Sequence, residues 1–283
     1  MEVRLTPRPQ LFIDMIGTCN GLLCMTELYF CDGRVLVVTV TNPITGEKLT
    51  LLRLPRSANS HVYYGPYMFS FGYHPRTGQY KVVHIPFQDG EDRFVLVCTL
   101  GHDQSWREVL LPTPCESHKY SRNNIIVSVD GSTYWLTKQC DRIVALNLED
   151  DSITSFDAPP TGVGSTPVPA LPDCQLTNVQ ARLGVVVTRH NNLLGKTMDV
   201  WVLECGGEQP RWSLNYTVFE PIINDGGTWI MAPYFTHGEY VLSKTAAQML
   251  LYGWKVGDLE NREDEKTRLR PLEGDSGHHE RDG

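Results

Sequence analysis

Short segments of alternating hydrophobic and polar residues run along this chain, separated by turn-forming residues. The segments are rich in Val, Ile, Tyr, Trp and Phe, and alternation with a period of two is typical of β-strands. No window of about a dozen residues before Gly257 carries the apolar stripe of an amphipathic helix. The pattern predicts an all-β chain, with strands over 34–40, 80–85, 94–100, 125–129, 133–136, 142–148, 199–203 and 239–242.

Turn motifs recur along the chain and indicate a repeated unit. NPITGE at 42–47 returns as HPRTGQ at 74–79; in both, proline presets φ and glycine suits the left-handed position of a bulged hairpin. Strands ending in a proline recur at 54–55, 111–112, 158–159 and, more loosely, 220–221, with about four strand segments in each interval. The sequence therefore predicts a β-propeller of about five or six four-stranded antiparallel blades. A two-sheet β-sandwich is the alternative, but it leaves the recurrence unexplained.

The two ends of the chain differ from this pattern. We expect an N-terminal segment over 1–15, the propeller over 16–256 and a charged, disordered tail over 257–283, where aromatic and β-branched residues are nearly absent. The last strand segments leave the final blade short of a strand. Because propellers close by pairing first and last segments, we expect 3–5 or 11–16 to supply it.

Composition narrows the classes of partner. The chain has 283 residues and a formal net charge of −8, from 33 acidic and 25 basic residues, which offers no electrostatic footprint for nucleic acid. Its apolar runs are far shorter than the roughly 20 residues of a membrane-spanning helix, and its start lacks the features of a secretory signal. We therefore expect a cytoplasmic or nuclear protein that binds neither nucleic acid nor membrane.

Candidate chemistry is sparse. The 8 cysteines contain no Cys-x-x-Cys pair and are interpreted as buried free thiols. No phosphate-binding loop, nucleophile elbow or His-Glu-x-x-His motif appears. Some propellers hold a metal with carboxylates over the central channel, and the candidates for that role are Asp14, Glu27, Asp130 and Asp173. Nothing in the sequence brings these four together, so we expect no enzyme activity, no cofactor and no metal.

Several blocks resemble, in order, the plant F-box-associated domain with a kelch-like propeller. TCNGLLCM at 18–25 resembles the family's opening strand, and FGYHPRTGQYKVVHI at 71–85 resembles its hallmark, with His74 where Asp is usual. The other matching blocks are VTNPITGEKLTLLRLP at 40–55, SWREVLLP at 105–112, VSVDGSTYWLT at 127–137, RIVALNLEDDSITSFDAPP at 142–160, MDVWVLE at 198–204 and MLLY at 249–252.

The resemblance implies a substrate receptor of an SCF-type cullin-RING ubiquitin ligase. In that family the propeller holds the protein to be ubiquitinated, and an N-terminal F-box binds a Skp-type adaptor. The residues before the first matching block carry no recognisable F-box, which indicates a truncated or F-box-less form. We expect a substrate protein of unknown identity as partner, and Skp-type adaptor and cullin only if an F-box or a substitute is present. The alternative is a propeller hydrolase, or a sugar- or small-molecule-binding protein with a carboxylate-lined central pocket.

The longest predicted connections all cross one face of the propeller, because each joins an outer strand to the next blade's inner strand. Long loops on one face of a rigid scaffold are the usual place for recognition, and aromatic residues mixed with cations are typical of protein interfaces. By contrast, we expect four tryptophans, at 106, 135, 201 and 212, in the core. The candidate partner-binding residues are His61, Tyr63, Tyr64, Tyr67, His118, Tyr120, Arg122, Asn224, Asp225 and Trp229.

Overall fold

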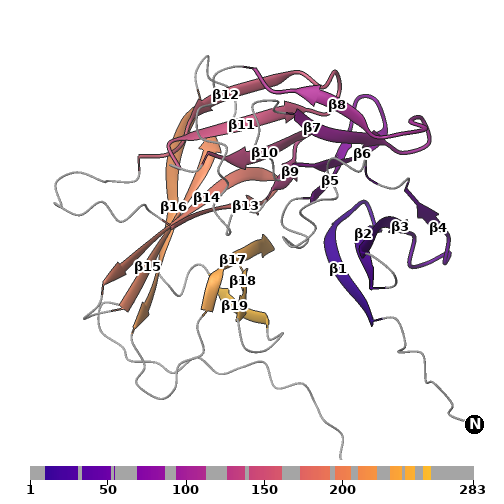
Figure 1. Ribbon diagram of the computed structural model, residues 1–283. Helices are drawn as coiled ribbons and strands as arrows, with labels where there is room; N and C mark the ends of the chain where they lie inside the picture. Colours follow the sequence, from indigo (N-terminus) through magenta and orange to yellow (C-terminus); the bar gives the residue numbers. More distant parts are fainter. Residues whose placement is uncertain are drawn as a thin grey trace, which may run out of the picture.

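The predicted all-β propeller is confirmed by a computed structural model. The structure describes residues 10–30, 34–51, 54, 69–86, 94–112, 126–137, 140–160, 173–191, 195–204, 210–221, 230–237, 240–245 and 251–255. These residues form strands β1 to β19 (Figure 1). Over these ranges the chain contains no helix suited to crossing a membrane.

The first sixteen strands form four antiparallel blades of four strands each. Blade 1 contains β1 (Gln10–Cys19), β2 (Leu22–Phe30), β3 (Arg34–Thr41) and β4 (Lys48–Thr50). Blade 2 contains β5 (Phe69–His74), β6 (Gln79–His84), β7 (Phe94–Thr99) and β8 (Arg107–Leu110). Blade 3 contains β9 (Val127–Val129), β10 (Ser132–Leu136), β11 (Arg142–Asn147) and β12 (Ile153–Asp157). Blade 4 contains β13 (Asp173–Val179), β14 (Arg182–Asn191), β15 (Gly195–Glu204) and β16 (Arg211–Pro221).

Three further strands follow blade 4. They are β17 (Ile230–His237), β18 (Tyr240–Thr245) and β19 (Leu251–Lys255). β17 pairs in parallel with β13, so these strands extend blade 4 into a seven-stranded sheet. The described part of the chain thus holds four complete blades and a three-stranded unit, where about five or six blades were expected.

The strand assignments from periodicity agree with β3, β6, β7, β9, β10, β11, β15 and β18. Residues 11–16, one of the two segments expected to close the last blade, lie instead in β1, which pairs with β2 of blade 1. The expected boundary between residues 15 and 16 therefore falls inside a strand. The other closing segment, 3–5, and the tail 257–283 lie outside the described residues and stay predictions.

The recurring turns adopt the geometry that their sequences predict. The amide of Gly46 donates to the carbonyl of Asn42 at 2.8 Å, and that of Gly78 donates to the carbonyl of His74 at 2.9 Å. Both glycines have a left-handed φ, of 74° and 70°, which costs glycine little because it has no Cβ. The same motif therefore joins β3 to β4 in blade 1 and β5 to β6 in blade 2.

The blades pack face to face, and alternate side chains enter different hydrophobic cores. In β6, Val82 lies between blades 1 and 2, whereas Val83 lies between blades 2 and 3. In β11, Leu146 lies between blades 2 and 3, whereas Ile143 lies between blades 3 and 4. We call these cores seam 1/2, seam 2/3 and seam 3/4. The strands β6, β7 and β11 of the middle blades are therefore buried on both faces over most of their length, which explains their continuous apolar runs.

The four tryptophans expected in the core lie at these seams. Trp106 belongs to seam 1/2 and Trp135 to seam 2/3. Trp201 and Trp212 pack against seam 3/4, and Trp212 Nε1 donates to the carbonyl of Asp157 at 3.0 Å. Core placement is thus confirmed for Trp106 and Trp135, which are buried, whereas Trp201 and Trp212 are half-buried against seam 3/4.

Candidate functional site

Partner binding was predicted at the end of the propeller where the inner strands begin, which we call the loop face. The inner strands β1, β5, β9 and β13 lie against their neighbours in turn, so their first residues share one end of the propeller. The predicted partner-binding residues lie outside the described residues and stay a prediction: His61, Tyr63, Tyr64, Tyr67, His118, Tyr120, Arg122, Asn224, Asp225 and Trp229.

The structure does describe how the long connections are anchored. Leu54 and Phe69 flank the first connection, and both are buried in seam 1/2. Leu111 and Ile126 flank the second connection, and both are buried in seam 2/3. Each of these connections therefore lies between two core residues. The propeller core fixes the two ends of the connection, and the residues between them are not required for core packing, which suits a recognition loop.

Blades 1 and 4 have longer strands than the two blades between them. β1 has 10 residues and β16 has 11, whereas no strand of blades 2 and 3 exceeds 6. Pairing in blade 4 continues to Asn191↔Gly195, beyond the Asp173↔Thr188 pair where β13 begins. In blade 1 it starts at Gln10↔Phe30. The extra pairs lie at the loop face. In blade 4 the outer strands extend past the start of the inner strand β13, whereas in blade 1 the inner strand β1 is itself part of the extended ribbon. Figure 1 shows the long strands β15 and β16 projecting.

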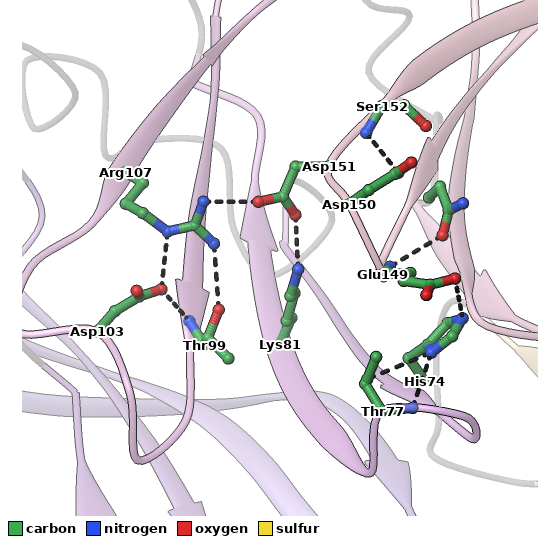
Figure 2. Close-up of polar contacts among 11 residues, drawn as sticks. His74, Thr77, Lys81, Thr99, Asp103, Arg107, Glu149, Asp150, Asp151 and Ser152 are labelled. Atoms are coloured by element: carbon green, nitrogen blue, oxygen red, sulfur yellow. Dashed lines mark hydrogen bonds and ion pairs between the residues drawn. The ribbon is translucent and has the colours of Figure 1, made fainter.

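The opposite end, the turn face, carries a network of ion pairs across seam 2/3 (Figure 2). Asp151 in the β11–β12 turn reaches from blade 3 to two cations of blade 2. Lys81 Nζ lies 2.7 Å from Asp151 Oδ1, and Arg107 Nη1 lies 2.6 Å from Asp151 Oδ2. The Lys81 side chain is only 3% exposed, and a buried ammonium requires such a carboxylate partner.

Asp103 completes the network from within blade 2. Its Oδ2 accepts from the Thr99 amide at 2.6 Å and from Arg107 Nε at 3.0 Å. Partial burial alone would raise the pKa of Asp103, but the hydrogen bonds from Thr99 and Arg107 outweigh it and lower this pKa below its ordinary value. A general acid needs a raised pKa, whereas the pKa of Asp103 is lowered. We therefore interpret the network as stabilising seam 2/3.

His74 stands where the resemblance implies Asp, and the structure shows how the turn accommodates the imidazole. The Thr77 amide lies 3.3 Å from His74 Nδ1, just as the Thr45 amide lies 3.3 Å from Asn42 Oδ1 in the matching turn of blade 1. The imidazole nitrogen thus serves as the acceptor that an Asx side chain supplies. His74 Nε2 also lies 3.8 Å from Glu149 Oε2 of blade 3.

Residues YKVV at 80–83, part of the block that carries the resemblance, connect blade 2 to both of its neighbours. Tyr80 accepts a hydrogen bond from Asn20 of blade 1 at 3.1 Å, and Val82 enters seam 1/2. Lys81 and Val83 point the other way, to Asp151 and to seam 2/3. The lysine within an apolar strand was the sequence signal for a buried ion pair, and the sequence reasoning missed it.

The carboxylates proposed for a metal site serve other purposes or stand apart. Glu27 is buried and accepts from Lys48 Nζ and Tyr29 Oη, both at 2.5 Å. The hydrogen bond from Lys48, followed by that from Tyr29, lowers the pKa of Glu27. Asp14 is exposed on β1, Asp130 occupies a hairpin turn with φ of 49°, and Asp173 begins β13. The described ranges contain no group of three or more His, Cys, Asp or Glu side chains that could hold a metal.

The cysteines that the structure describes are free thiols, as interpreted from the sequence. Cys24, Cys98, Cys140 and Cys174 are buried, and Cys19 is half-buried. Burial raises the pKa of Cys24 to about 12 and that of Cys98 to about 11. Because a nucleophilic cysteine needs a lowered pKa, neither residue has the properties of a catalytic nucleophile.

The family model and the curated relatives that match this chain agree on one family. A model of the F-box associated beta propeller domain matches residues 3–253. F-box protein At3g07870 of Arabidopsis thaliana is 25% identical over 233 residues, which cover 72% of this chain and 51% of that protein. F-box/kelch-repeat protein At2g43445 of the same plant is 28% identical over 208 residues, which cover 71% and 43%. The chain spans about half the length of these relatives.

Among solved structures, the β-propeller domain of Myceliophteria thermophila Cps50 (Swd1) matches at a TM-score of 0.41 with 12% identity, covering 87% of this chain and 86% of that one.

Proposed function

This chain belongs to the F-box associated β-propeller family, and from that membership we propose that it binds a substrate protein for ubiquitination. The loop face holds the partner, and the blades serve as the rigid framework. The role is recognition without catalysis. Family membership and the relatives named as F-box proteins support this reading.

The observation that carries the proposal is the anchoring of the long connections on buried core residues. Leu54 and Phe69 hold one connection, and Leu111 and Ile126 hold the next. Loops fixed at both ends lose less entropy on binding than loops on a mobile framework. Their sequences combine tyrosines at 63, 64 and 67 with cationic residues, a composition typical of interface hot spots.

For the whole protein we propose a role in an SCF-type ubiquitin ligase. Skp-type adaptor and cullin are then partners of a receptor that contains an F-box or a substitute, and the propeller contributes the specificity. This assembly places the protein in the cytoplasm or the nucleus. Because the ion pairs at the turn face hold blades 2 and 3 together, we assign that end of the propeller a structural role.

Affinity capture from plant extract tests the binding role. The bait is the full chain, compared with a Tyr63→Ala, Tyr64→Ala, Tyr67→Ala variant and with Arg76→Ala as the matched control. Arg76 is 74% exposed at the turn face, so its loss leaves the loop face untouched. We expect at least tenfold weaker recovery of a specific protein with the triple variant, at an unchanged melting temperature, and full recovery with Arg76→Ala.

Three possible results decide between parts of the proposal. Equal recovery by all three baits would reject the tyrosine loop as the binding site. Recovery of a loop-dependent partner together with Skp-type adaptor and cullin would support the ligase role. The same partner without adaptor or cullin would support binding and reject the ligase role for this chain.

A further inference from the structure

Blade 4 buries a carboxylate whose described polar contacts stay within that blade. Asp199 of β15 is 6% exposed. Its Oδ1 accepts a hydrogen bond from Thr217 Oγ1 of β16 at 2.7 Å, and its Oδ2 lies 2.6 Å from Arg189 Nη1 of β14. The Asp151 carboxylate, by contrast, connects blade 3 to two cations of blade 2. In the described part of the chain, Asp199 therefore bridges no seam, and its effect is on Arg189.

The strand register places this pair at the loop face. β14 continues past Thr188, the residue that pairs with the first residue of β13, and Arg189 comes next. Val187 of seam 3/4 pairs with Asp199, which pairs in turn with Thr217. Paired residues share one face of a sheet, and so do residues two apart in a strand. The three polar side chains thus continue the apolar face of seam 3/4 towards the loop face.

The two charged side chains differ in their exposure. The Asp199 side chain is 8% exposed, whereas the Arg189 side chain is 49% exposed. A guanidinium presents five N–H donors in a planar fork, which matches a carboxylate or a phosphate. Asp199 contacts this fork through Nη1 and fixes its orientation, while the exposed part of the side chain leaves donors for a second acceptor. The buried carboxylate therefore positions Arg189 for an anion that arrives from solvent.

Stability alone does not account for an ion pair at this position. Taking charges out of water costs free energy, so a buried ion pair generally stabilises a fold no more than apolar residues of similar volume. The neighbouring row of the same face is apolar, with Val185 opposite Trp201. Further apolar residues would extend seam 3/4 at least as well as Arg189 and Asp199 do. The pair therefore indicates recognition, and arginine is among the residues that dominate protein interfaces.

We propose that Arg189 anchors an oxyanion on a side chain of the partner protein, and that Asp199 and Thr217 position its guanidinium. The oxyanion is the carboxylate of Asp or Glu or the phosphate of a phosphorylated residue, because both match the fork. This inference rests on the proposed binding of a partner at the loop face, and it adds the chemistry that the partner presents there.

The chain itself is a poor source of the oxyanion. The connection that leads into β13, TGVGSTPVPALP at 161–172, contains no acidic residue. The acidic residues of 257–283 follow β19, whose last residue Lys255 pairs with Tyr240 at the start of β18. Because β17 runs parallel to β13, the end of β17 and the start of β18 lie at the turn face, away from Arg189. We therefore assign the oxyanion to a partner protein.

Degenerate peptide pools, in which one central residue is fixed and its neighbours are random, test the anchor on the full chain. The fixed residues are Glu, phosphoserine and their neutral counterparts Gln and Ser. The principal variant combines Arg189→Gln with Asp199→Asn, so that no buried charge loses its partner. Arg211→Gln is the matched control, because Arg211 is exposed at the turn-face end of blade 4. We expect the full chain and the control to bind a charged pool at least fivefold more tightly than its neutral counterpart, and the combined variant to lose this difference.

The stronger of the two charged pools identifies the source of the oxyanion. Equal binding of charged and neutral pools by the full chain, or the same difference in the combined variant, would overturn the inference. Arg189→Lys replaces the combined variant if that protein fails to fold, because lysine keeps the charge but lacks the planar fork. We expect Arg189→Lys to reduce the difference at least threefold, and an undiminished difference would overturn the inference in the same way.

Thr217→Val tests the positioning of the guanidinium without changing the net charge. One peptide from the stronger pool is synthesised with the oxyanion and with its neutral counterpart, and both are titrated by calorimetry. We expect the affinity for the charged peptide to fall at least threefold and that for the neutral peptide to stay the same. An equal loss for both peptides would reject the positioning role.

Affinity capture distinguishes the failure of this inference from the failure of the proposed function. If a captured partner depends on the tyrosines at 63, 64 and 67 but is recovered equally by the combined Arg189 variant, the inference fails and the proposed function stands. If the charged pools bind through Arg189 while no captured partner depends on these tyrosines, the anchor stands and the tyrosine loop is rejected.

Discussion

Gly72 shows how closely the inner strands of blades 2 and 3 approach one another. A Cβ placed there would lie 2.6 Å from Leu148 Cδ1 and 2.8 Å from Ser128 Cβ, whereas a Cβ at Gly17 of the inner strand β1 would meet nothing within 4 Å. We expect Gly72→Ala to lower the free energy of unfolding by about 1–3 kcal/mol, as overpacking does, and Gly17→Ala to have little effect. Urea denaturation of the two variants measures the difference, and equal stabilities would contradict the close packing.

The buried thiols make a prediction about reactivity. Burial raises the pKa of Cys24 to about 12 and that of Cys98 to about 11, so almost no thiolate is present at pH 8. We expect iodoacetamide to label both residues only after unfolding, and to label the half-buried Cys19 faster in the native protein. Peptide mass spectrometry with and without urea checks this order. Rapid native labelling of Cys24 would show that seam 1/2 opens readily.

At the scale of the elements, the β11–β12 turn joins blade 3 to blade 2 through one carboxylate. Replacing Asp151 with Asn leaves the buried Lys81 without a counter-charge, which typically costs about 3–5 kcal/mol. The φ of Asp151 is 60°, a conformation that Asn tolerates as well as Asp. The substitution therefore tests the charge and not the backbone.

The neighbouring residue provides the control for this element. Asp150 lies in the same turn but is exposed, so Asp150→Asn should change stability far less. Thermal denaturation of both variants gives the comparison. Similar losses in the two proteins would show that Asp151 contributes no more than a surface charge.

The strands and turns also show which features of the fold can be predicted from the sequence alone. Period-two alternation and the Pro-x-Thr-Gly turns predict the strands and hairpins because both signals are local, within a few residues of one another. By contrast, Lys81 and Asp151 are 70 residues apart in the sequence. Their ion pair forms only because one face of blade 2 packs against blade 3, which local patterns do not predict. The placement of β1 in blade 1 has a different origin, because β1 pairs with β2 across the adjacent Asn20–Gly21 turn, a local signal that the closure prediction did not use. The tyrosine loop was predicted from composition, and the structure supplies its anchors at Leu54 and Phe69.

At the scale of the whole molecule, the polar groups that hold the blades predict how the propeller responds to acid. The hydrogen bond from Lys48, and then that from Tyr29, lowers the pKa of Glu27 in blade 1. Bonds from Thr99 and Arg107 lower that of Asp103 in blade 2, against the effect of burial. A carboxyl whose pKa is lowered by folding contributes stability above its unfolded pKa and loses it as the pH falls through its folded pKa.

The expected outcome is a melting temperature that is steady near neutral pH and declines as the pH falls from about 4.5 towards 2, where both carboxylates take up protons. Glu27→Gln and Asp103→Asn together should lower the melting temperature at pH 7 and flatten this decline, so the curves of variant and parent approach each other in acid. Scanning calorimetry between pH 2 and pH 7 measures both curves. Parallel curves would mean that other groups control the acid response. Converging curves would show that Glu27 in blade 1 and Asp103 in blade 2 contribute to the acid response, because the stability that each carboxylate adds at pH 7 is lost when it is protonated.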